Sequence, residues 1–139
     1  MIEQTLAIIK PDGVARNLIG EIIRRIESGG LTVKALKMAH LSKKEVQGFY
    51  AVHRERPFFD SLTTFMSEGP VVLMILSGEG AISLWRDLMG VTDPAKAAPG
   101  SIRREFGISI ERNTTHGSDA PETAAFETAY FFNRLEACN

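Results

Sequence analysis

Val71-Val72-Leu73-Met74-Ile75-Leu76 is the most hydrophobic run of the chain, with Gly69-Pro70 before it and Gly78-Glu79-Gly80 after it. An apolar run between turn-forming residues predicts a β-strand. A second run, Thr5 to Lys10, stops at Pro11-Asp12-Gly13 and is typical of a strand that is covered on both faces. The two runs therefore predict a sheet with helices packed against it.

The sequence between these two strands contains the patterns of several helices and of one further strand. Ile19, Ile22, Ile23 and Ile26 recur at the i, i+3, i+4 and i+7 spacing of an amphipathic helix, which Gly29-Gly30 ends. Leu31 to Leu41 is predicted to be the next strand. Ser42 and Glu45 form a capping box that starts a further helix, and a second short helix follows the Arg54–Pro57 break. Together these two helices predict a helical hairpin.

The remaining third of the chain holds a long loop and one more strand. From Gly90 to Gly100 the sequence has neither helical nor strand periodicity of its apolar residues. This segment is predicted to be a long and functional loop. A helix is expected from an Asp119 N-cap to about Glu127, and Ala129 to Phe132 is expected to form a final strand. The order of elements favours an α/β protein of the α+β kind, with a ferredoxin-like βαββαβ arrangement: a four-stranded antiparallel sheet covered by helices, an added helical hairpin and a long loop. Residues 1–139 are expected to form a single domain.

Composition restricts the classes of function. The net charge is −1, so no general affinity for nucleic acid or membranes is expected, and any cationic site must be a local cluster. Cys138 is the only cysteine, which excludes disulfides within the chain and indicates a reducing compartment. The N-terminus shows no signal peptide, and the longest apolar run is too short to span a bilayer. A cytoplasmic protein is therefore expected.

The heptapeptide Asn113-Thr114-Thr115-His116-Gly117-Ser118-Asp119 places one imidazole among small polar residues. With a helix start directly after it, His116 is expected on a loop, exposed but held in place. At a pKa of ~6.5 a histidine is mostly neutral at pH 7 and can act as a nucleophile or a base. From the heptapeptide alone, a surface or capping histidine is an equally good interpretation.

Several familiar catalytic motifs are absent from the sequence. There is no Walker A loop, no Gly-x-Gly-x-x-Gly after a strand, no metal-ligand spacing of histidines and cysteine, and no nucleophile elbow. What remains is a set of polar residues at loop and strand ends: Lys10, Arg86, Thr92, Arg103, Asn113 and His116. If the fold brings its three cations together, they form an anion site, and phosphate is the natural ligand. Phe58-Phe59 offers one ring more than the apolar stripe needs, either a stacking platform or an exposed apolar side chain.

The heptapeptide resembles the active-site signature of nucleoside diphosphate kinases. Further segments resemble that family in the same order along the chain: Leu6–Gly13, Gly48–Tyr50, Arg56–Phe59, Gly69–Val72, Arg86–Gly90 and Pro99–Arg103. The resemblance covers nearly the whole chain. It departs at Trp85, where many relatives carry a polar residue; Trp85 is expected to pack beneath its helix.

This resemblance implies an enzyme that transfers the γ-phosphate of a nucleoside triphosphate, typically ATP, to a nucleoside diphosphate or deoxynucleoside diphosphate. The transfer would be ping-pong, through a phosphohistidine on His116, with Glu127 and Ser118 orienting the imidazole. The other implied site residues contact the nucleotide: Arg86, Thr92 and Arg103 the phosphates, Lys10 and Asn113 the ribose hydroxyls and the transferring end, Phe58 the base, while Tyr50 lines the site. Base specificity is expected to be low, because every base has a π-face to stack on.

The resemblance also implies a cofactor and an assembly. Mg²⁺ would bridge the nucleotide phosphates with few or no direct protein ligands. A homo-oligomer is expected, with a tetramer favoured and a dimer or hexamer as alternatives. Two other functions stay open: a non-catalytic nucleotide-binding or adaptor protein on the same fold, and a nucleic-acid-binding protein, although no specific nucleic acid is expected at a net charge of −1.

Overall fold

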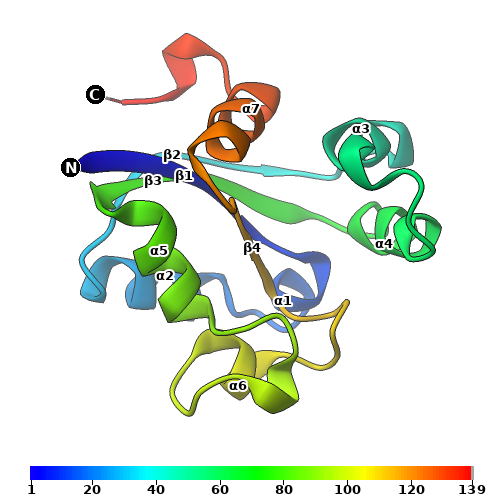
Figure 1. Cartoon of the computed structure of the whole chain (residues 1–139), viewed down its shortest axis with the longest axis horizontal. Coiled ribbons are helices and arrows are strands. Elements are labelled where there is room, and N and C mark those ends of the chain that lie inside the picture. The colour runs from blue at the N-terminus through cyan, green and yellow to red at the C-terminus, as the bar shows by residue number, and fades with distance from the viewer. Residues whose placement is uncertain (139) are drawn as a thin grey trace.

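A four-stranded antiparallel sheet forms the centre of the molecule in the computed structural model, which describes residues 1–138 (Figure 1). Its strands are β1 (Ile2–Ile9), β2 (Thr32–Ala39), β3 (Val71–Glu79) and β4 (Thr115–Gly117), in the order β2-β3-β1-β4. Strand β1 pairs with β3 from Ile2 opposite Glu79 to Ile9 opposite Val72. This topology confirms the predicted ferredoxin-like α+β fold.

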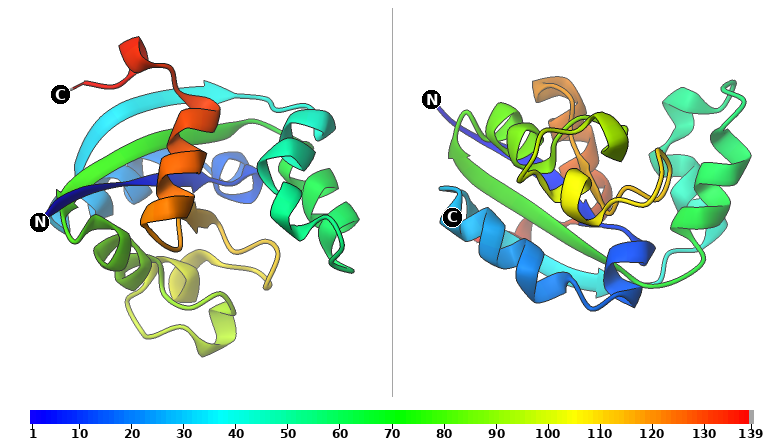
Figure 2. Two further views of the ribbon diagram at one scale, coloured as in Figure 1. Left: turned by 45° about the horizontal axis from the view of Figure 1, so that its top comes forward. Right: turned by 90° about the horizontal axis from the view of Figure 1, so that it is seen from below.

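Helices cover both faces of the sheet and one of its ends (Figures 1 and 2). The α-helices are α1 (Pro11–Ala15), α2 (Ile19–Ser28), α3 (Lys43–Phe49), α4 (Phe59–Met66), α5 (Ala81–Met89), α6 (Ile102–Phe106) and α7 (Pro121–Phe131). Three short 3₁₀ helices are η1 (Ala51–His53), η2 (Pro94–Lys96) and η3 (Arg134–Glu136). The predicted hairpin is α3 and α4, inserted between β2 and β3.

Alternate residues of the central strands point into two separate cores, as the pleat of a strand requires. Leu6, Ile8, Leu73 and Ile75 pack with residues of α3, α4 and the end of α7. Ala7, Ile9, Met74 and Leu76 pack with residues of α2, α5 and α6. Both faces of β1 are therefore buried from Thr5 to Ile9, as the unbroken apolar run there predicts.

The predicted strand at Ala129–Phe132 is wrong, because Ala129–Phe131 complete helix α7 and Phe132 is its C-cap. Two rings of that helix are held in helical positions: Phe131 packs against the first core, and the Tyr130 hydroxyl donates to the Glu45 carbonyl oxygen at 2.6 Å. The fourth strand is instead Thr115–Gly117, at one edge of the sheet beside β1. Three residues ending in glycine are too short to show a strand pattern.

Two local predictions around the heptapeptide are also corrected. His116 lies in β4, opposite Ile8 of β1, and not on a loop. Asp119 does not cap α7; the helix has Ala120 at its N-cap, and the Thr123 hydroxyl accepts from the Ala120 N–H at 2.9 Å. The capping box at the start of α3 is confirmed, since Ser42 and Glu45 each accept from the other's backbone N–H.

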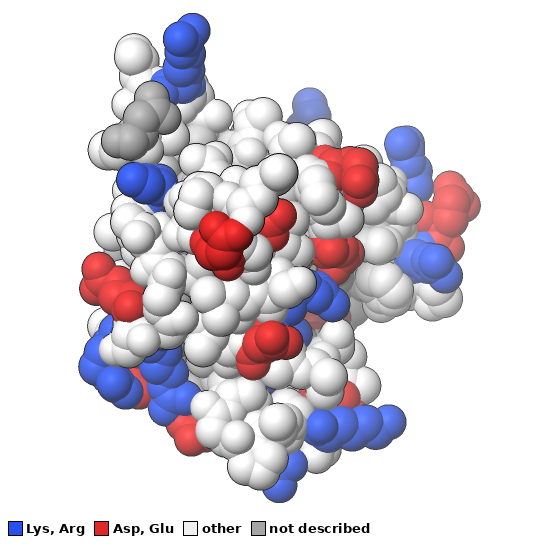
Figure 3. All heavy atoms as spheres, turned by 60° about the vertical axis from the view of Figure 1, so that its left-hand side comes forward, with Lys and Arg blue, Asp and Glu red and all other residues white. Residues whose placement is uncertain are grey.

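Surface charge is mixed in sign. On the face that Figure 3 shows, Lys and Arg side chains are interspersed with Asp and Glu side chains and do not form one continuous basic patch. No helix of residues 1–138 has the length and apolar character needed to cross a membrane.

Candidate active site

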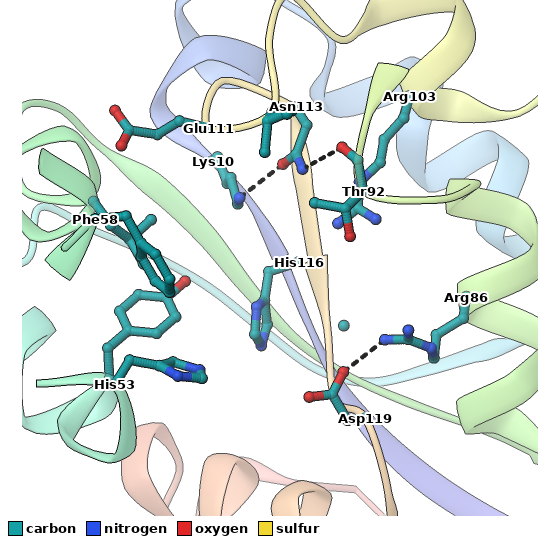
Figure 4. A pocket seen from close by; sticks show the side chains of 14 residues that line it. Lys10, His53, Phe58, Arg86, Thr92, Arg103, Glu111, Asn113, His116 and Asp119 are labelled. Atoms are coloured by element: carbon teal, nitrogen blue, oxygen red, sulfur yellow. Dashed lines mark hydrogen bonds and ion pairs between the residues drawn. The ribbon is translucent and has the colours of Figure 1, made fainter. Parts of the chain in front are cut away.

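A cavity of about 440 Å³ opens where the ends of several elements meet (Figure 4). Eight of the ten predicted site residues line it: Lys10, Tyr50, Phe58, Arg86, Thr92, Arg103, Asn113 and His116. The other two, Ser118 and Glu127, lie behind His116 and bond to it or to each other. The fold therefore brings together Lys10 at the end of β1 with residues of the α3–α4 hairpin, α5, the long loop, α6, and β4 with the segment before it.

His116 is held by a chain of hydrogen bonds on its far side from the cavity. Its Nε2 lies 2.9 Å from Glu127 Oε1, and the same oxygen accepts from the Ser118 hydroxyl at 2.9 Å. Ser118 Oγ in turn accepts from the Leu6 backbone N–H of β1 at 3.1 Å. Among the described residues, Nδ1 makes no hydrogen bond. The ring is thus oriented through one nitrogen while the other is free to meet a ligand.

The backbone of His116 is fixed as well. The indole Nε1 of Trp85 donates to the His116 carbonyl oxygen at 3.1 Å, and Trp85 itself is fully buried, as expected from the sequence. A Cβ at Gly117 would lie 2.6 Å from Trp85 Cδ1, so the close approach of α5 to β4 requires glycine there. These contacts place the imidazole with little freedom to move.

Thr114 stores backbone strain next to the histidine. Its φ of +75° lies in the left-handed region, which costs a β-branched residue roughly 1–3 kcal/mol. Two contacts to the start of the chain hold it there: its hydroxyl donates to Asp12 Oδ2 at 3.0 Å, and its carbonyl accepts from the Lys10 N–H at 2.8 Å.

Lys10 and Asn113 form one polar wall of the cavity. Lys10 Nζ donates to Asn113 Oδ1 at 2.7 Å, and Asn113 Nδ2 donates to the Thr92 carbonyl oxygen at 3.0 Å (Figure 4). Burial, together with the nearby Arg103 charge, lowers the pKa of Lys10 to about 7. An anionic ligand would favour the charged form of this lysine.

Arg103 and Arg86 bring two guanidinium groups to the cavity. Arg103 donates to the carbonyl oxygens of Gly90 at 3.0 Å and Thr115 at 2.8 Å, while its buried Nε has no partner among the described residues. Burial and the Arg86 charge lower the pKa of Arg103 to about 10. Arg86 pairs with Asp119, with Nη1 and Oδ1 2.7 Å apart. Three cations therefore meet at one cavity in a chain with no positive excess.

The hairpin supplies an aromatic wall at the other end. Phe58 is 47% exposed, whereas Phe59 packs against the core, so Phe58 is the outward ring that the sequence could not distinguish. Tyr50 is buried beside His116, and burial with the nearby Glu127 carboxylate raises its pKa. Leu62 and Ile110 complete the apolar part of the lining.

Six residues that line the cavity were not predicted as site residues: His53, Leu62, Ile110, Glu111, Gly117 and Asp119. Gly117 and Asp119 carried a signal, because both belong to the heptapeptide around His116. His53 also carried one, because it follows Tyr50 by three residues, about one helical turn, at the end of the predicted helix. Ile110 and Glu111 carried none, because they belong to an irregular segment with no periodic pattern.

Comparison with known proteins identifies the family. The family model described as nucleoside diphosphate kinase matches residues 3–137. The chain belongs to the nucleoside diphosphate kinase family. A curated nucleoside diphosphate kinase of Nitratidesulfovibrio vulgaris is 62% identical over 136 residues, 98% of each chain, and one of Geotalea uraniireducens is 56% identical over 135 residues, 97% of this chain and 98% of that one.

Solved structures of nucleoside diphosphate kinases have the same fold as this chain. The enzyme of Aquifex aeolicus superposes with a TM-score of 0.96 at 44% identity, covering 99% of both chains. A halophilic nucleoside diphosphate kinase of Halobacterium salinarum, solved in complex with CDP, gives a TM-score of 0.96 at 39% identity and covers 100% of this chain and 93% of that one.

Proposed function

We propose that His116 Nδ1 is the nucleophile in the phosphotransfer between nucleotides that this enzyme catalyses. The hydrogen bond from His116 Nε2 to Glu127 carries this assignment, because it leaves Nδ1 as the ring nitrogen with a free lone pair. In the first step the Nδ1–P bond forms as the bond from the γ-phosphorus to the β,γ-bridging oxygen breaks, and a nucleoside diphosphate leaves. In the second step a terminal oxygen of another diphosphate attacks phosphohistidine and frees the imidazole.

The cations around the cavity would hold the transferring group. Phosphoryl transfer needs positioning and neutralisation of charge on the equatorial oxygens, and Arg86, Arg103 and the Thr92 hydroxyl would bind the phosphates. Arg103 already has Nη1 and Nη2 fixed on backbone carbonyl oxygens, so its guanidinium group is held in place before a phosphate binds. Glu127 would stabilise the imidazolium-like charge that develops on His116.

The nucleoside would lie between the polar wall and the aromatic wall. Lys10 and Asn113, which are bonded to each other, would contact the ribose hydroxyls and the transferring end, and Phe58 would stack on the base. Stacking on one exposed ring distinguishes bases poorly. This geometry supports use of several nucleoside and deoxynucleoside diphosphates.

Mg²⁺ bound by the nucleotide phosphates is part of the proposal. Within residues 1–138, no three His, Cys, Asp or Glu side chains gather as a metal site. The phosphate oxygens of a nucleotide would supply the oxygen ligands that Mg²⁺ prefers. The metal would neutralise phosphate charge; the protein side chains would bind, orient and carry the phosphoryl group.

A homo-oligomer in the cytoplasm completes the proposal, with a tetramer favoured. The edge strand β2 supports assembly, since Leu36 and Met38 are 53% and 57% exposed along it. Light scattering or sedimentation would give the mass directly. A dimer or hexamer would change the proposed assembly without affecting the chemistry at His116.

The alternative of a non-catalytic nucleotide-binding protein predicts no turnover. Mixing the protein with ATP, Mg²⁺ and a diphosphate such as dTDP would decide between them. We expect formation of the new triphosphate in the native protein and loss of this activity in His116→Ala. Nucleotide binding without any exchange would favour the adaptor.

A further inference from the structure

Glu111 is an acid at the base end of the cavity that the proposed chemistry does not use. It lines the cavity together with Phe58, Leu62 and Ile110, and Figure 4 shows its carboxylate extending toward the helical wall that carries Phe58. The other lining acid, Asp119, lies at the opposite end and pairs with Arg86. Phe58, Leu62 and Ile110 thus form an apolar slot in which the base would lie, and one carboxylate borders this slot.

The position of this carboxylate is fixed from both walls. The Ser61 hydroxyl of α4 donates to Glu111 Oε1 at 3.1 Å, which joins the hairpin to the segment that carries Ile110. The next residue, Arg112, makes two hydrogen bonds to Glu68 at 3.0 and 3.1 Å and stacks over the Phe65 ring. These contacts leave Oε2 of Glu111 without a hydrogen-bond partner among the described residues.

A carboxylate only accepts hydrogen bonds at neutral pH. A base edge that presents N–H groups would gain a bond there, whereas an edge that presents a carbonyl oxygen would meet a repelling charge. We propose that Glu111 is a specificity-determining residue that favours bases carrying an exocyclic amino group over their oxo or unsubstituted counterparts. This inference rests on the proposed function and adds a moderate preference to the indiscriminate stacking on Phe58.

Matched acceptor pairs test the inference. Guanosine and inosine diphosphate differ by the 2-amino group, and cytidine and uridine diphosphate differ at the 4-position. Labelled phosphoenzyme is made first and then mixed with each acceptor over a range of acceptor concentrations. The reaction is quenched at set times, and the loss of label from the protein gives the rate. We expect at least one amino-bearing acceptor to show a second-order rate constant about three- to tenfold above its partner, the range for one hydrogen bond.

Glu111→Gln should bring that ratio to within about twofold of one, because an amide can donate as well as accept. Ser61→Ala removes the hydroxyl but keeps the carboxylate, so it should retain a preference. Glu27→Gln, an exposed acid on α2, is the matched control and should keep the native ratio. If the rates for all acceptors fall equally in Glu111→Gln, then Glu111 only connects α4 to the segment that carries Ile110. This result would overturn the inference.

Two further outcomes would also overturn it: native ratios of one in both pairs, or a change confined to the ribose-to-deoxyribose ratio. Failure of the proposed function looks different, because no phosphoenzyme would form in the first place.

Discussion

His116 Nε2 and Glu127 Oε1 lie 2.9 Å apart, and Ser118 donates to the same carboxylate oxygen. One carboxylate thus orients the imidazole, and the backbone of β1 orients that carboxylate through Ser118. Because hydrogen bonds to charged groups contribute about 1.5–3 kcal/mol, Glu127→Gln should slow phosphorylation of His116 roughly ten- to hundredfold. Single-turnover quench with labelled ATP measures this rate. An unchanged rate would remove Glu127 from the mechanism, and Ser118→Ala should show a smaller effect in the same direction.

Lys10 should make nucleotide binding depend on pH. Its pKa is lowered to about 7 in the free protein, and bound phosphates, being anionic, should raise it again. Binding above pH 7 should therefore take up a proton, and affinity should fall as pH rises from 7 toward the usual lysine value of 10.5. Calorimetry in buffers of different ionisation enthalpy measures the uptake.

Lys10→Met is the control for that linkage, since it removes the titrating amine and keeps an unbranched side chain. Proton uptake near pH 8 should disappear in the variant. Release of protons by the native protein, or equal uptake in both proteins, would contradict the assigned role of Lys10.

The sequence predicts the elements whose residues form a long apolar run or a local capping motif. It does not predict an element as short as three residues. The apolar run of Thr5–Lys10 and the capping box at Ser42 predict their elements correctly because each depends on neighbours in sequence. Strand β4 was missed because its pairing with β1 spans more than a hundred residues of sequence and involves three residues. The aromatic run Tyr130-Phe131 favours a strand by propensity, but packing against the core holds it as a helix.

The site was predictable for residues that lie in recognisable motifs. Lys10, Arg103 and His116 line one cavity, as the family resemblance implies. The Trp85 bond to the His116 carbonyl and the Asp119 pair with Arg86 depend on how α5 approaches β4. Periodicity along one helix carries no information about such an approach.

Arg103→Lys should lower both turnover and stability. A lysine keeps one charge but cannot reach the Gly90 and Thr115 carbonyl oxygens while also presenting an N–H to phosphate. Loss of a preorganised donor in a phosphoryl-transfer site costs about 10²–10³-fold in kcat. Pre-steady-state quench would measure the rate of phosphorylation and a thermal melt the stability. A native rate in the variant would show that Arg103 has a structural role alone.

Phe58→Ala should weaken nucleotide binding without creating a base preference. Base stacking on an aromatic ring contributes about 1–3 kcal/mol and tolerates any base, so Kd should rise by a similar factor for all diphosphates. Because Phe58 is half-exposed, its removal should leave the melting temperature nearly unchanged. Fluorescence or calorimetric titration with several diphosphates gives the comparison. A loss confined to one base would contradict stacking as its role.

Trp85→Phe should reduce catalysis from outside the cavity. The change removes the Nε1–H that donates to the His116 carbonyl oxygen, at a cost of about 0.5–1.5 kcal/mol in stability, while it keeps most of the buried ring. We expect a lower melting temperature and slower phosphorylation with little change in nucleotide affinity. A variant with native kinetics would show that the backbone of β4 is fixed without this bond.

The imidazole of His116 is proposed to carry the phosphoryl group between two nucleotides. This role is tested by incubating the protein with γ-labelled ATP and Mg²⁺ in the absence of an acceptor and then locating the label. We expect a label on His116 that resists base, is lost in acid, disappears when any nucleoside diphosphate is added, and is absent from His116→Ala. A label on serine, or triphosphate exchange without any labelled protein, would rule out the phosphohistidine.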